Sequence, residues 1–208
     1  MNQSSAQRYL PGAMQLLLCR HEIRRCGVGS VAAPLVAGAA LGAGVAVSTD
    51  GAGTPGAWAA GAALSLVAGL ATAAGLSREP LVELHLTLPT PYRTTVGRRL
   101  LMLVGSAAIG ALALAASAHG ESAATAAHVA GLTTLLLAVA AWACVALPSA
   151  GAASGAVIGA WLGVLLVLDR LAQGSIGVAV FVALATLPAV SAHRALGDPE
   201  RLLPRGAS

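Results

Sequence analysis

The residues of this chain that could do chemistry are few and scattered. His119, Glu121 and His128 are near enough in sequence to meet a metal ion, but their spacing matches no standard metal site, and interfacial polar residues are the simpler interpretation. The sequence has no HExxH or GxSxG motif and no acidic cluster inside an apolar run, which an intramembrane hydrolase or transferase needs. We therefore predict no catalytic residue, no metal site and no enzymatic activity.

Nucleotide-binding motifs are equally weak. Residues 51–56, GAGTPG, fit a dinucleotide fingerprint by letters alone, but no strand precedes them and Pro55 interrupts the pattern, so a turn is predicted there. A phosphate-binding GxxxxGK[ST] loop requires a lysine, and the chain has none. We expect no directly bound cofactor.

Composition assigns the chain to the membrane proteins. Of its 208 residues 57% are hydrophobic and only 10% are charged, whereas soluble domains carry about a quarter charged residues. The net charge of +4 comes from scattered arginines without a basic block, so it reports membrane topology and predicts no nucleic-acid partner. Cys19, Cys26 and Cys144 form no CxxC pair; Cys19 and Cys26 could be acylated beside the membrane or remain inert thiols.

The largest polar stretch is residues 77–99, SREPLVELHLTLPTPYRTTVGRR, which separates two long apolar runs. A polar segment of this size must lie outside the lipid, on the side that prefers positive charge, which is the cytoplasm. Its leucines alternate with polar residues until Pro89 and Pro91, which stop a helix soon after it starts. We predict a short amphipathic helix and a turn, after which the chain continues from Tyr92 into the next apolar run.

This segment resembles the one between the second and third spans of ABC exporter permeases of the type-2 class. In that family a Glu-Leu-Leu-x-x-Thr-Pro core precedes a Gly-Lys or Gly-Arg pair at the start of the third span. The matching residues are Glu83, Leu84, Leu86, Leu88, Pro89, Thr90, Pro91, Gly97 and Arg98.

The resemblance implies that the segment couples the chain to an ATPase. The residues expected to carry this coupling are Glu79, Glu83, Leu84, Leu88, Pro89, Pro91, Tyr92 and Arg93. It also implies a separate cytoplasmic ABC ATPase subunit that binds ATP and Mg, and a second permease subunit in a homodimer or heterodimer. The alternative is a solvated loop that merely joins two spans.

Uncharged runs of about 20 residues predict an all-helical domain at 27–192 with six spans. The predicted spans are 27–47, 57–76, 100–118, 126–147, 151–168 and 174–192, with Pro148 and Ser149 in a tight turn. Residues 8–25 of the amino-terminal region 1–26 predict a helix in the membrane interface, the alternative being a signal peptide. Residues 193–208 form a tail.

Arginine positions predict the orientation. With both termini in the cytoplasm, every arginine except Arg170 lies on the cytoplasmic side, as expected for a multi-pass protein of the plasma membrane. The family resemblance implies the same layout, although residues 169–173 leave no room for the re-entrant helices that the family often carries before its last span. We expect no buried charged residue within the spans, which argues against an ion-driven carrier.

A stripe of glycines follows the predicted fifth span, where Gly151, Gly155, Gly159 and Gly163 recur every four residues on one helix face. Such a face admits another helix at close range, either within the same bundle or on a second permease subunit. Gly38 and Gly42 form a shorter version in the first span.

Together these features predict the permease subunit of an ATP-driven ABC exporter, embedded in membrane lipid and handling an amphipathic or lipid-like cargo. Two alternatives remain open: a permease of the haem-exporter kind, and a scaffold or accessory subunit that transports nothing.

Overall fold

The computed structural model describes residues 23–24, 26–47, 55–77, 92–117, 123–147, 149–168 and 175–196, and over these residues the protein is all-helical. The helices are α2 (Val28–Val47), α3 (Pro55–Leu76), α5 (Tyr92–Ser117), α6 (Ala123–Ala146), α7 (Ala150–Gly163), which continues into a π-helical turn η2 (Val164–Leu168), and α9 (Ser175–Leu196). The predicted interfacial helix at 8–25, apart from Ile23 and Arg24, and most of the tail lie outside the described residues.

Six helices in this part of the chain are long and apolar enough to span a membrane, which confirms a multi-pass membrane protein. The third of these spans starts at Thr94, earlier than predicted, because α5 is one continuous helix from Tyr92. Ser149 caps α7 by accepting a hydrogen bond from the Ala152 N–H at 3.2 Å, so the chain reverses between the fourth and fifth spans where the sequence predicts a turn.

The spans are rich in alanine and glycine, whose small side chains allow helices to pack closely in the apolar lipid. A helix satisfies its own backbone hydrogen bonds in lipid, and small side chains then let two backbones approach. The central helix of the bundle is α3, because 67% of the residues in its span are buried, whereas 17% of those in the α7 span are buried. Every other helix of the bundle except α9 packs extensively on α3.

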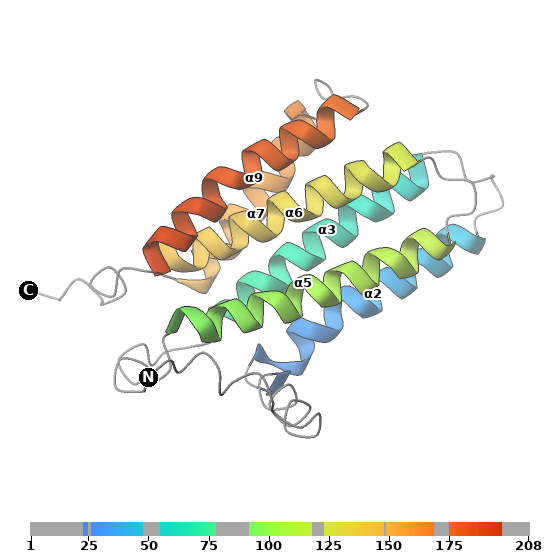
Figure 1. The fold of residues 1–208 in the computed structure, drawn as a ribbon. Coiled ribbons are helices and arrows are strands. Elements are labelled where there is room, and N and C mark those ends of the chain that lie inside the picture. Colours follow the sequence, from blue (N-terminus) through green and yellow to red (C-terminus); the bar gives the residue numbers. More distant parts are fainter. Residues whose placement is uncertain are drawn as a thin grey trace, which may run out of the picture.

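The bundle consists of two groups that share α3 (Figure 1). On one side α2 and α5 pack along each other and against α3; on the other side α6 packs on α3, α7 and α9. Contact between α5 and α6 is slight, and α5 and α9 have at most marginal contact. The two groups are therefore separated along the line between α5 and α9.

Glycines join α2 to α5. The backbones of these two helices come so close that a Cβ built on Gly38 would collide with the backbone of Gly110. A Cβ built on Gly110 would collide with the carbonyl oxygen of Pro34. Gly42 is also buried, so the shorter glycine pair of the first span does pack inside the bundle.

The largest core cluster surrounds α6. Leu132 and Leu136 of α6 are fully buried with Val157 of α7 and Phe181 of α9. A buried hydrogen bond of 2.8 Å joins the hydroxyls of Ser65 on α3 and Thr133 on α6. The same hydroxyls also lie 2.8 Å from the carbonyl oxygens of Gly61 and Val129, so two hydrogens are shared among three contacts.

Trp161 ties α7 to α3 through a hydrogen bond of 2.9 Å from its Nε1–H to the Ala62 carbonyl oxygen. We expect Trp161→Phe to lower the free energy of unfolding by about 1 kcal/mol, because phenylalanine keeps most of the ring contact but lacks the donor. Thermal unfolding of the detergent-purified protein measures the change. Trp142→Phe is the matched control, since no hydrogen bond is described for its indole; equal losses in both variants would refute the role of the Trp161 donor.

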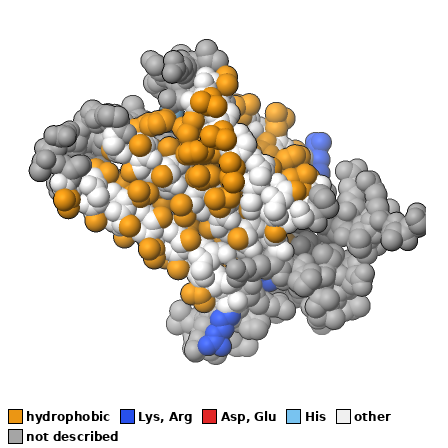
Figure 2. All heavy atoms as spheres, turned by 180° about the vertical axis from the view of Figure 1, so that it is seen from behind, with side chains coloured by type: hydrophobic (Ala, Val, Ile, Leu, Met, Phe, Trp, Pro, Cys, Tyr) orange, Lys and Arg blue, Asp and Glu red, His pale blue; other side chains and the backbone are white. Residues whose placement is uncertain are grey.

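The described cationic side chains gather at one end of the bundle. Arg24, Arg98, Arg99 and Arg194 all belong to this end, which we call the arginine end, and the starts of α2 and α5 and the end of α9 lie there (Figure 1). The side of the molecule in Figure 2 is covered by hydrophobic side chains, and the visible arginine atoms lie at its margins. Gly27 has a φ of 85°, a left-handed conformation that interrupts the helical backbone just before α2 at this end.

Candidate functional site

An open groove of about 500 Å³ lies where the two helix groups separate. Its walls are α5 and α9 and its floor is α6, while Leu76 of α3 closes part of one end. The residues that line it are mostly apolar: Leu76, Val96, Gly97, Arg99, Leu100, Val104, Thr134, Leu137, Ala138, Ala141, Cys144, Val145, Ala189, Ala192 and His193.

Two small residues on the floor help to leave the groove open. Ala138 and Ala141 of α6 project too little to fill the space between α5 and α9. The wall of α9 begins just after Pro188, whose missing N–H removes one bond from the helix ladder. Thr134 on the floor is exposed, which shows that the groove is open along its side.

The groove runs from the arginine end toward the middle of the membrane. From Thr134 to Val145 it follows α6 for about 16 Å, at a helical rise of about 1.5 Å per residue. The hydrocarbon of a bilayer is about 30 Å thick. The groove thus has the length of one leaflet.

Arg99 is the main departure from the sequence-based expectations. We expected no buried charge within the spans, but Arg99 lies in the span Thr94–Ala116, lines the groove and is only 1% exposed. Its neighbour Arg98 is exposed. The expectation was wrong because the third span was placed at 100–118, which left Arg99 just outside it.

A signal for this burial is present in the sequence. The buried residues Val96, Leu103, Ala107 and Leu114 of α5 share one helical face, and Arg99 falls on the same face three residues after Val96 and four before Leu103. Of two consecutive arginines only one can lie on that face. The spacing selects Arg99.

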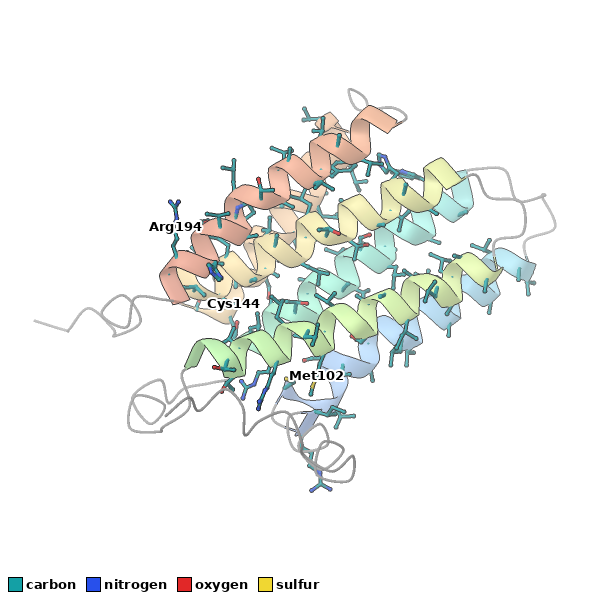
Figure 3. The ribbon with its side chains drawn as sticks, viewed as in Figure 1. Met102, Cys144 and Arg194 are labelled. Atoms are coloured by element: carbon teal, nitrogen blue, oxygen red, sulfur yellow. The ribbon has the colours of Figure 1, made fainter. Side chains whose placement is uncertain are left out.

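Cys144 on the floor and His193 on the α9 wall complete the polar lining of the groove. The Cys144 thiol lies 3.4 Å from the Ser77 hydroxyl and donates to the Ala73 carbonyl oxygen at 3.5 Å. Figure 3 shows Cys144 at the same end of the bundle as Arg194, whose side chain points away from the helices. The exposed Arg194 is thus not part of the groove, although His193 next to it is.

The predicted ATPase-coupling residues fall largely outside the described part of the chain. This applies to Glu79, Glu83, Leu84, Leu88, Pro89 and Pro91. Tyr92 and Arg93 form the first turn of α5, about two helical turns before Arg99. The predicted coupling segment and the groove are therefore connected by one helix.

The glycine stripe on α7 faces away from the described bundle. A Cβ built on Gly155, Gly159 or Gly163 meets no atom within 4 Å, and one on Gly151 meets only the Ser149 hydroxyl at 4.0 Å. Packing of this stripe within the described bundle is therefore not observed. Contact with a second subunit stays a prediction.

The described part of the structure tests only part of the prediction that the chain has no metal site. His119 and Glu121 lie outside the described residues, and the part that is described contains no group of three or more potential metal ligands. His128 instead packs edge-on against Phe181, with ring centroids 4.8 Å apart and an interplanar angle of 83°.

The search for similar proteins found no matching family model, curated protein or solved structure.

Proposed function

We propose that this chain is the permease subunit of an ATP-driven ABC exporter of the type-2 class. It works with a second permease and with separate ATPase subunits, which bind ATP and Mg. The arginine end faces the cytoplasm, because cytoplasmic ends of spans carry the excess of arginine, and the protein resides in the plasma membrane.

The observation that carries the proposal is the continuity of α5. This helix of 26 residues begins at Tyr92, directly after the segment that resembles a coupling helix, and runs to Ser117 without interruption. At about 39 Å it is long enough to cross the membrane. A push on its first turn by a closing ATPase is carried as a rigid-body movement to Val96, Leu100 and Val104, which line the groove.

The exposed face of α7 provides the place for the second permease. Three of its glycines border open space, so another helix can approach the backbone closely. In this proposal the cargo path lies between the two permeases.

Co-purification with an ATPase tests the proposal directly. The tagged protein is extracted from its native membrane in mild detergent, either intact or with Glu83 and residues 84–88 replaced by glycine and serine. We expect an ATPase to accompany the intact chain and to be lost from the variant, because a docking helix without its leucines and carboxylate has no face to insert into a groove.

A matched control replaces residues 119–124, a polar stretch predicted to lie on the opposite side of the membrane, and should retain the ATPase. Both variants must elute from size exclusion as the intact protein does. If no ATPase co-purified even with the intact chain, the exporter proposal would be refuted and a scaffold or accessory subunit would be favoured. Retention of the ATPase by the 83–88 variant would refute the coupling role of that segment.

A further inference from the structure

We infer that the outward face of α5 at the arginine end is a binding site for an anionic phospholipid, with the phosphate at Arg98 and Thr94 and one acyl chain along the apolar residues that follow. The inference goes beyond the proposed transport function and does not rest on it, because a lipid can occupy this face whether or not an ATPase binds.

The polar end of the site lies on the first turns of α5. Arg98 and Thr94 are both exposed and are four residues apart, so they lie on one face of the helix. The planar guanidinium presents several N–H donors that match the oxygens of a phosphate, and the threonine hydroxyl supplies one more donor. Arg98 lies about 6 Å along α5 from Thr94, where the apolar span begins, which places both groups at the border between hydrocarbon and headgroups.

Charge complementarity selects an anion. None of the residues that the structure describes is acidic, so no described carboxylate neutralises Arg98. Unlike its buried neighbour Arg99, Arg98 is accessible from the surrounding membrane. An arginine at this level of a bilayer attracts anionic headgroups, with a gain of roughly fivefold in affinity for each residue.

An apolar stripe continues from Arg98 along the same face of α5. Leu101 and Ile109 are 73% and 59% exposed and follow Arg98 at helical spacing. Gly105 lies between them, and a Cβ built on it would meet nothing within 4 Å, so an acyl chain can lie close to the backbone there. From Arg98 to Ile109 the helix rises about 17 Å, about the depth of one leaflet. The polar and apolar parts of this face thus follow each other as in a phospholipid, and a free soluble anion would gain nothing from the stripe.

Native mass spectrometry of the detergent-purified protein, titrated with dioleoyl phosphatidylglycerol or dioleoyl phosphatidylcholine, tests the headgroup contact. We expect phosphatidylglycerol to bind the intact protein about fivefold more tightly. Arg98→Gln should remove this preference, and Arg98→Lys should keep most of it because lysine retains the charge. Arg24→Gln is the matched control: it removes the same charge from the arginine end, before the first span, and should leave the preference unchanged. No preference in the intact protein, or equal losses in Arg98→Gln and Arg24→Gln, would overturn the inference.

The acyl-chain contact has its own pair of variants. Gly105→Leu fills the space within the stripe without meeting a neighbouring helix, and it should weaken both lipids several-fold. Gly44→Leu is the control, because Gly44 is likewise open to the surroundings but lies near the far end of α2. We expect the control to change neither affinity. Equal effects of the two leucines would refute the site on α5.

Two further titrations use the intact protein, so they do not depend on the folding of any variant. Raising the ammonium acetate concentration from about 0.1 M to about 1 M shortens the Debye length from about 10 Å to about 3 Å and should remove most of the preference for phosphatidylglycerol. Inorganic phosphate at the concentration of the lipid should not displace phosphatidylglycerol, because phosphate has no acyl chain. A preference that survives high salt would contradict the charge contact with Arg98, and displacement by inorganic phosphate would identify a free anion as the occupant and refute the phospholipid.

Discussion

Gly110→Val should strongly destabilise the protein, by about 3 kcal/mol. The space beside Gly110 is filled by the Pro34 carbonyl oxygen of α2, and Gly38 of α2 lies against Gly110 in return. Overfilling a core costs about 1–3 kcal/mol when side chains can move aside. Here the obstacle is the backbone of another helix, so α2 must shift as a whole, and the cost lies at the upper end of that range.

Thermal unfolding of the detergent-purified protein, followed by the intrinsic fluorescence of its tryptophans, measures this effect. Gly105→Val is the matched control, because Gly105 lies on the same helix and a Cβ built there meets nothing within 4 Å. Both variants introduce the same β-branched side chain, so differences in helix propensity cancel. If the two variants melted together, the close approach of α2 and α5 at Gly38 and Gly110 would be refuted.

Phe181→Ala should cost about 2–3 kcal/mol of unfolding free energy. Phe181 is 0% exposed on α9, contacts His128 edge-on and lies where a Cβ on Gly131 would be 3.3 Å from its ring. A buried phenylalanine truncated in a soluble core costs about 3–5 kcal/mol. The loss is smaller in a membrane protein because lipid is as apolar as the core, so the cavity and lost contacts remain while the transfer from water does not.

The same unfolding measurement tests this prediction, with Val182→Ala as control. Val182 is the next residue of α9 and is 48% exposed, so its truncation leaves no cavity. We expect the control to change the melting temperature little. A control that loses as much as Phe181→Ala would mean that the α9 face assigned to α6 is wrong.

Both predictions concern contacts within the two helix groups on either side of the groove. Gly110 holds α5 to α2, and Phe181 holds α9 to α6, while α5 and α9 have at most marginal contact. The groove width therefore depends on how the two helix groups sit on α3. A movement of α5 relative to α6 changes the groove without breaking either interface.

Much of the architecture follows from the sequence. Span number and position depend on apolar run length, which is a one-dimensional property, because a lipid-exposed chain must bond its own backbone as helix. The runs near 27–47 and 57–76 accordingly reappear as α2 and α3. The turn capped by Ser149 was also predictable from the sequence, because a proline and a serine lie together within a long uncharged run and favour the end of one helix and the cap of the next.

Only the tertiary structure decided which helix face meets which neighbour. Gly38 and Gly42 form the shorter glycine motif, yet they are buried, whereas Gly155 and Gly159 of the longer stripe border open space. Spacing places residues on a common face but says nothing about what that face contacts. For Arg99 the spacing on α5 already favours the buried face, but only the arrangement of α5, α6 and α9 shows that this face borders a groove. What a buried face contacts depends on neighbours distant in the chain, which no local pattern contains.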